Sequence, residues 1–195
     1  MNSHIANLFL AISRTLTALT DGEGKPYFRF IDQEYGQLEW HNGDNRPPVT
    51  WPCVLIDIDN VAYQNMSELA QTGMVTVVLR LGFPPFSGTS NITPSTYQQK
   101  ALYYYDLEQV IYLALHGQQP VLLSQPADEE ETPVNLLADV FGSFTRISAR
   151  TEQREDHIRV RTITYTIALE DYTATPGSTI IVSPVEPAFT FTIDN

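Results

Sequence analysis

The chain has one cysteine, Cys53, among its 195 residues, so it can form no internal disulfide framework and fits assembly in a reducing compartment. It also lacks any uninterrupted apolar run near the roughly 20 residues of a membrane helix. Its first residues have no basic segment, so we expect no secretory signal peptide and no membrane partner. Histidines are few and unpaired at metal-ligand spacing, which predicts no metal site: His4, His41, His116 and His157.

Basic residues are scarce, with 11 Lys and Arg against 23 Asp and Glu, and the net charge is −12. This balance argues against general affinity for DNA or anionic membranes, because both repel an acidic protein. The charge is nevertheless segregated. An acidic run comprises Asp128, Glu129, Glu130 and Glu131, whereas five arginines, here called the arginine ribbon, fall close together: Arg146, Arg150, Arg154, Arg159 and Arg161.

The arginine ribbon has three interpretations: a solvated hairpin, an ion-pairing surface between subunits, or a set of phosphate contacts. Glu152, Glu155 and Asp156 interleave with the arginines, which weakens the nucleic-acid interpretation. The acidic run is either a solvated loop or the matching subunit contact. Segregated charges of this kind are compatible with neighbouring subunits that meet charge to charge. The two sets together are our predicted subunit interface.

Residues with catalytic potential are isolated in the sequence. Cys53 lies inside an apolar run, which is typical of a buried core residue rather than a nucleophile. Asp57 and Asp59 alternate on a strand and suggest a divalent-ion pair, but no third ligand follows at a useful distance. Tyr103–Tyr105 suggest a stacking platform, although three successive helical residues face different directions. We therefore expect no catalytic residue and no cofactor.

The periodicity of apolar residues outlines the elements. Helical spacing predicts helices over 4–19 and 94–116, and Thr132–Pro133 predicts a further short helix or turn ending near Gly142. Alternation predicts strands, which we place at 27–31, 54–58 and 74–83, with two short candidates at 179–182 and 189–193. We expect one domain over 1–172 and an extended C-terminal arm over 173–195.

Residues 144–169 read as a long hairpin that turns near 153–156. Its apolar positions change parity on the return arm, from Ile158 and Val160 to Ile163 and Tyr165. Such a change predicts a β-bulge, or an arm whose tip projects beyond the core sheet. The predicted class is α+β: a mixed, mostly antiparallel sheet backed by two main helices, with a long projecting β-hairpin and the C-terminal arm.

The order of these elements resembles a known family. An opening helix precedes the strand Trp51–Ile58 and a further strand, Met74–Phe83; a long helix, Pro94–His116, and a late ribbon ending at Arg159–Ile167 complete the pattern. Over roughly residues 1–170 this is similar to the tail-terminator and neck proteins of tailed bacteriophages, particularly a version found in phages of Bacteroidetes. The segment from Thr173 onward goes beyond the family's compact pattern.

The resemblance implies a non-enzymatic virion protein without catalytic residues. Its subunits would close into a homo-oligomeric ring, a hexamer in tails and sometimes a dodecamer nearer the portal. The implied partners are neighbouring neck, portal-adaptor or tail-tube proteins, with phage DNA passing transiently through the ring. Two other classes remain open: a monomeric module that binds a peptide or glycan on its sheet or at Tyr103–Tyr105, and an enzyme that uses Asp57 and Asp59 with a metal.

Overall fold

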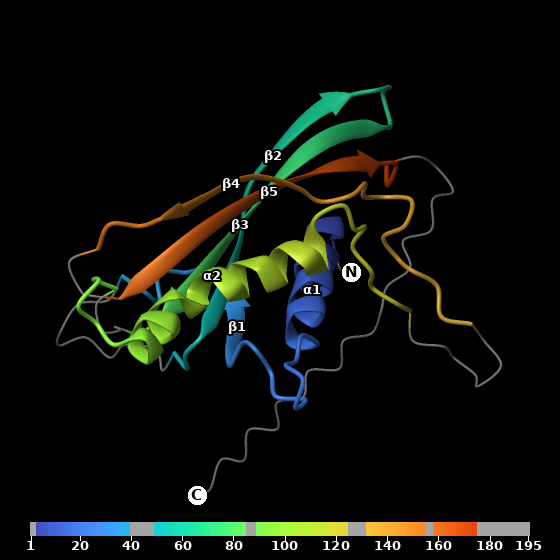
Figure 1. Ribbon diagram of the computed structural model, residues 1–195. Helices are drawn as coiled ribbons and strands as arrows, with labels where there is room; N and C mark the ends of the chain where they lie inside the picture. Colours follow the sequence, from blue (N-terminus) through green and yellow to red (C-terminus); the bar gives the residue numbers. More distant parts are fainter. Residues whose placement is uncertain (1–2, 40–48, 85–88, 125–131, 155–157, 175–195) are drawn as a thin grey trace, which may run out of the picture.

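A computed structural model describes residues 3–39, 49–84, 89–124, 132–154 and 158–174. Two helices cover one five-stranded sheet, which confirms the predicted α+β class (Figure 1). The acidic run Asp128–Glu131 lies outside the described residues. So do nearly all of the predicted C-terminal arm and its strand candidates at 179–182 and 189–193. No helix in the described part is long and apolar enough to cross a membrane.

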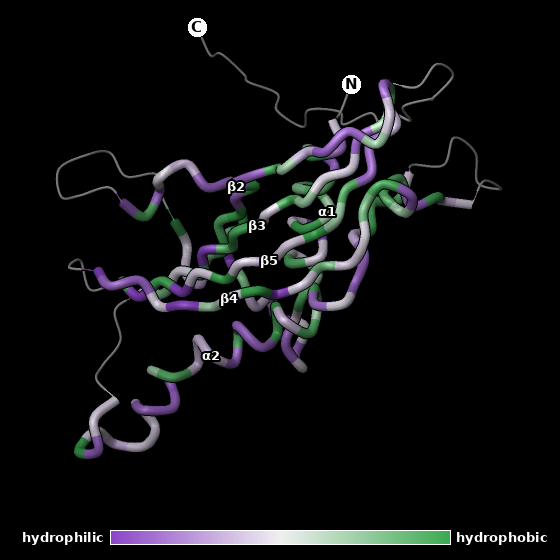
Figure 2. Tube along the Cα trace, turned by 90° about the horizontal axis from the view of Figure 1, so that it is seen from above, coloured by the Kyte–Doolittle hydropathy of each residue, from purple (hydrophilic) through white to green (hydrophobic). Residues whose placement is uncertain are grey.

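The sheet has the strand order β1-β2-β3-β5-β4. Its strands are β1 (Phe30–Gln33), β2 (Cys53–Asn65), β3 (Gln71–Phe83), β4 (Thr145–Thr151) and β5 (Arg159–Asp171). Only the β1–β2 pair is parallel; the other three pairs are antiparallel. Figure 2, viewed from above, shows β2, β3, β5 and β4 side by side in that order. The edges of the sheet are therefore β1 with the exposed part of β2, and β4.

The helices form where the periodicity predicted them. The first, α1 (His4–Thr17), begins at Ser3, whose hydroxyl accepts a hydrogen bond from the Ala6 amide at 3.1 Å. This cap satisfies one of the amides that have no partner in the first turn. The second, α2 (Ser95–Leu115), follows Pro94 and ends before Gly117, whose φ of 77° is the left-handed conformation that glycine adopts most readily.

The main core lies between the helices and one face of the sheet. Alternate residues of β3 are fully buried there, as predicted: Val75, Val77, Leu79, Leu81 and Phe83. Helix α1 contributes Leu8, Ile12 and Leu16. Each such side chain removed from water stabilises the fold by about 2 kcal/mol before entropy is counted. Burial of this stripe holds both helices on one side of the sheet (Figure 1).

A smaller core on the opposite face corrects our interpretation of the parity change in β5. Ile158 and Val160 pack there with Leu38, Cys53 and Leu55, whereas Ile163 and Tyr165 face the main core. Strand β5 pairs with β3 in unbroken register from Arg159 to Asp171, so the predicted bulge in its return arm is wrong. The apolar residues change from even to odd positions because the first part of β5 is buried on the face of the smaller core and the rest on the face of the main core. A bulge does occur, but in β4 between Arg146 and Ser148.

The hairpin predicted at 144–169 forms, because β4 pairs antiparallel with β5, but the β2–β3 hairpin is longer. Strand β4 has 7 residues, whereas β2 and β3 have 13 each and stay paired to the turn between Asn65 and Gln71. Strand β2 continues beyond the predicted 54–58 to Asn65 because it stays paired with β3, and most of its residues after Ile58 are exposed. This β2–β3 hairpin extends past both helices (Figure 1).

One smaller prediction differs from the structure and another is resolved by it. The strand expected at 27–31 forms later, as β1, because Phe30–Gln33 pairs with Cys53–Ile56. Of the short helix or turn predicted after Thr132–Pro133, the turn forms, and in it the Asn135 side chain accepts from the Leu122 and Leu137 amides. A side chain that satisfies backbone amides in this way competes with helix formation.

Candidate subunit interface

Two members of the arginine ribbon meet a buried carboxylate on α2. Arg161 donates from Nε to Oε2 of Glu108 at 2.6 Å, and Nη1 of Arg146 lies 3.5 Å from Oε1 of the same residue. Glu108 is only 8% exposed. The pairing raises the pKa of Arg161, chiefly through its hydrogen bond to Glu108. These two arginines therefore hold α2 against β4 and β5 within the subunit.

Two further members of the ribbon also have partners inside the chain. Arg159 donates to the Tyr104 hydroxyl at 2.9 Å, and its guanidinium lies 4.9 Å from the centre of that ring. Arg154 donates to Glu39 at 3.0 Å and to the carbonyl oxygen of Leu38. Among the described residues Arg150, exposed on β4, is the one member of the ribbon with neither an ion pair nor a side-chain hydrogen bond. It is the member best placed for a contact with another subunit.

Sequence reasoning missed a second charge cluster, centred on Arg80. Its guanidinium contacts three carboxylates: Glu34 at 3.0 Å, Glu39 at 2.5 Å and Glu152 at 2.7 Å. Local pattern places Arg80 on the polar side of a strand but gives no sign of its partners, which are 41 to 72 residues away in the sequence. The cluster joins β3 to the segments that follow β1 and β4.

The Arg80 cluster changes the acidity of its carboxylates. Hydrogen bonding from Arg80 holds the pKa of Glu39 below its ordinary value. Burial alone would raise the pKa of Glu152, but hydrogen bonds from Arg80 and Thr162 outweigh it and lower that pKa. Both carboxylates are thus ionised partners in a structural cluster.

One edge of the sheet is open along most of β2. Strand β1 covers β2 only from Cys53 to Ile56, and the last backbone bond on that side runs from the Glu34 amide to the Ile56 carbonyl. From Asp57 to Asn65, no strand of the described chain pairs with this edge. The strand carries no lysine, arginine or proline, residues that commonly protect an exposed edge. Its backbone groups are available to an added strand.

A pocket of about 530 Å³ lies where β1 stops covering β2. One wall is the first half of α1, with Ile5, Ala6, Phe9 and Leu10, and the floor includes Gln33. The other wall consists of three successive residues, Ile56–Ile58. Successive side chains of a strand point to opposite faces of the sheet. A pocket that contacts three successive residues therefore lies at the edge of β2 and not on one face. It occupies the position that a longer β1 would fill.

Carboxylates lie beside this pocket without a cationic partner. Burial raises the pKa of Asp57, and the nearby charge of Asp59 raises it further. No ion pair within the described residues reaches either carboxylate. The register of β2 against β3 shifts between Ile58 and Asn60, which places Asp59 at a bulge on the exposed part of the strand. The open edge of β2 is therefore acidic next to an apolar pocket.

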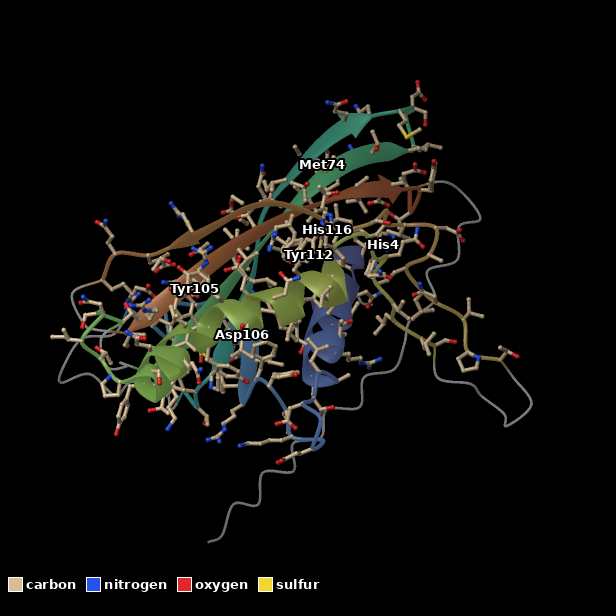
Figure 3. The ribbon with its side chains drawn as sticks, viewed as in Figure 1. His4, Met74, Tyr105, Asp106, Tyr112 and His116 are labelled. Carbon is tan, nitrogen blue, oxygen red and sulfur yellow. The ribbon has the colours of Figure 1, made fainter. Side chains whose placement is uncertain are left out.

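The opposite edge of the sheet, formed by β4, is basic, whereas the β2 edge is acidic. Strand β4 pairs with β5 on one side, and no described strand pairs with its other side from Ile147 to Thr151. The β4 bulge leaves Ile147 57% exposed. At the start of the strand, the Arg146 amide donates to Nδ1 of His116, which covers the outer edge at that point. Further along the strand, Arg150 is exposed to solvent. Figure 3 shows His116 beside Tyr112 at the end of α2.

The remaining candidates do not converge on a reactive centre. Cys53 is fully buried, and burial raises the pKa of its thiol to about 12, so it has no thiolate character near neutral pH. The Nε2 atom of His4 lies 3.7 Å from Oδ1 of Asp171 and does not meet His116. Tyr104 is buried, whereas its neighbours Tyr103 and Tyr105 are exposed, so the three rings form no common platform. Within the described ranges no three His, Cys, Asp or Glu side chains are grouped to hold a metal ion.

The fold of the chain is similar to that of a solved virion protein. No protein-family model matches the chain, and no curated protein matches it. The backbone is similar to that of a chain in the "Virion of native gene transfer agent (GTA) particle", with a TM-score of 0.49 and 12% sequence identity. The match covers 88% of this chain and 100% of that one. Similarity this low carries no conclusion about what the chain does.

Proposed function

We propose that this protein is a non-enzymatic structural component of a phage-like virion. It forms a homo-oligomeric ring at the tail terminus or head–tail junction, connects tail to head and lets DNA pass. The observation that carries this proposal is the pair of open sheet edges, acidic at β2 and basic at β4. The family resemblance of the element order supplies the place in the virion.

The two edges lie at opposite ends of the strand order and cannot pair within one subunit. Contact between two different patches is head-to-tail, and it generates a closed ring when the rotation between subunits closes. Opposite charges favour this pairing over contact between like edges, because like charges repel. The ring is most simply a hexamer, with a dodecamer as the larger alternative.

The β2–β3 hairpin is the proposed contact to the next layer of the virion. It exposes large apolar side chains beyond the helices, including Tyr63, Met66 and Met74. Figure 3 labels Met74 on this hairpin, where Met74 pairs with Ala168 of β5 and keeps its side chain 47% exposed. Exposed apolar side chains gathered on a projecting element are typical of an interaction site. A neighbouring neck, portal-adaptor or tail-tube protein would cover them.

The net charge of −12 suits a channel through which DNA slides. A cationic wall would hold phosphates, whereas an acidic protein gains nothing by binding them. In the described chain every arginine of the ribbon except Arg150 is engaged with side chains or backbone of the same subunit. The proposed passage of DNA is therefore non-specific and transient.

Native mass spectrometry and negative-stain microscopy of the purified chain test the proposal. We expect a defined ring of six or twelve copies, and the same protein in purified virions in that number per particle. A monomer at every concentration, with no copy in the virion, would contradict it. A monomer that gains thermal stability with one added peptide or glycan would instead indicate the binding-module class.

A further inference from the structure

We propose that the pocket between α1 and β2 receives Ile147 from the β4 edge of a second copy of this chain, a contact that rests on the proposed ring. The β4 edge of one subunit then continues the sheet of the next, along the open part of β2. The occupant is specified by three features of the two edges: shape, backbone and charge.

The shape argument begins at the β4 bulge. Strand β4 has two register partners on β5 for Arg146 and Ser148 but none for Ile147 between them. The unpaired residue is a large aliphatic side chain, 57% exposed, at the outer edge of a sheet. An exposed isoleucine at a bulge is stabilised by a matching apolar pocket, which removes roughly 25 cal/mol of hydration cost per Å² buried.

The pocket provides that apolar surface. Ile5, Phe9 and Leu10 pack only partly against the main core and leave part of their surface toward the pocket. Ile56 and Ile58 form the facing wall. The volume of about 530 Å³ accommodates one aliphatic side chain together with the strand that carries it. A segment in this position lies where β1 would have continued.

The backbone argument concerns what lies beside the pocket. The open edge of β2 starts at Asp57, immediately next to the pocket wall, and continues to Asn65. A strand whose isoleucine enters the pocket has its following residues alongside this edge. Main-chain hydrogen bonds then supply affinity while the pocket sets the register. The open part of β4, from Ile147 to Thr151, has the length to use it.

Charge selects the second copy as the occupant. Arg150 follows Ile147 by three residues and has no ion pair in the described chain, and Asp57 and Asp59 beside the pocket have none either. Docking Ile147 therefore brings an unpaired cation toward two unpaired carboxylates. The β2 edge cannot pair with itself at this point without placing like charges together.

The first test uses single substitutions at exposed positions. Ile147→Asp places a charge on the side chain that is proposed to enter the pocket. Ala6→Trp fills the pocket with a bulky ring. We expect both to abolish rings in native mass spectra while the urea midpoint of the monomer stays unchanged. Val134→Asp is the matched control, because Val134 is equally exposed (59%) and lies on neither edge. Rings of Ile147→Asp as complete as those of the wild type would overturn the inference.

A charge exchange tests the electrostatic part. Arg150→Glu alone and Asp59→Lys alone are expected to lower ring yield at least tenfold at low salt. The double variant in one chain restores rings, because every contact then joins a reversed β4 edge to a reversed β2 edge. If both single variants lose ring yield and the double variant does not regain it, the assignment of Arg150 and Asp59 as partners is overturned.

Cross-linking tests the geometry directly. Ala6→Cys and Ile147→Cys chains, mixed and treated with a short bismaleimide, are expected to give a dimer that neither chain gives alone. A chain with both cysteines gives a ladder that ends at the ring number; Cys53 is buried and stays unlabelled. Wild-type rings without these cross-links would overturn only the docking contact. The absence of rings from both the pure protein and the virion would overturn the proposed function as well.

Discussion

Glu108 of α2 and Arg161 of β5 form a 2.6 Å charge-assisted hydrogen bond on the helix-covered face of the sheet. Arg146 of β4 approaches the same carboxylate, so one acidic side chain is shared by arginines of two strands. Both arginines belong to the ribbon whose charge pattern predicts a contact between subunits. The interface prediction for the ribbon now concentrates on Arg150, and Arg146 and Arg161 have a role in the subunit's own stability.

Replacing Glu108 by glutamine tests that role. The variant leaves two arginines without their carboxylate on a largely buried face, where loss of one partner costs about 3 kcal/mol of unfolding free energy. Urea denaturation followed by tryptophan fluorescence measures the change. Asp106→Asn, on the exposed side of the same helix (Figure 3), is the control and should change stability by less than about 0.5 kcal/mol. Equal stabilities of the two variants would contradict the assignment.

The Arg80 cluster predicts a specific pH dependence. Glu39 and Glu152 have folded pKa values below 4.5, so their ionised forms stabilise the fold above that pH, and this contribution is lost as the pH falls through the folded values. In Arg80→Met the strongest of the interactions that lower these pKa values is lost, whereas those from Arg154 and, at Glu152, from Thr162 remain. We expect the stability gap between wild type and Arg80→Met to shrink between about pH 5 and pH 3 in urea titrations. A gap independent of pH would show that Arg80 acts through packing alone.

Charge reversal separates the interface from the fold within the arginine ribbon. Arg150→Glu should weaken ring assembly and leave the monomer's stability within about 0.5 kcal/mol, because Arg150 is exposed. Arg159→Glu should cost about 1–2 kcal/mol of stability, because it loses the Tyr104 hydroxyl and the ring beneath it. Sedimentation velocity and urea denaturation give the two readouts. Complete rings of Arg150→Glu at both low and high salt would show that Arg150 is a solvated side chain with no part in assembly.

Tyr165 has a buried hydroxyl with no hydrogen-bond partner among the described residues. Burial raises its pKa to about 12. Tyr165→Phe should therefore keep or raise stability, by up to about 1 kcal/mol, since an unsatisfied polar atom is removed. Above about pH 10 the advantage of the variant grows, because the unfolded tyrosine ionises more readily than the folded one. A clear loss of stability, measured by thermal unfolding, would imply a partner for the hydroxyl.

Local pattern was enough to place the helices and the central strand. The alternating apolar residues of β3 from Val75 to Phe83 all face the core, and α2 buries Ala101, Tyr104, Leu107 and Ile111 as its spacing predicted. These features depend on the period of the backbone, which is a property of consecutive residues. The same reasoning failed in β5, where Val160 and Ile163 are buried on opposite faces against different neighbours.

By itself the sequence determined the acidic balance, the single thiol, the α+β class and the faces of the regular elements, because each follows from composition or from residues close together in the chain. Only the tertiary structure decided that Glu108 lies between Arg146 and Arg161, that Arg80 gathers three carboxylates, and that an apolar pocket adjoins the open edge of β2. Those relationships join residues tens of positions apart. They depend on strand order and register, which short-range periodicity does not encode.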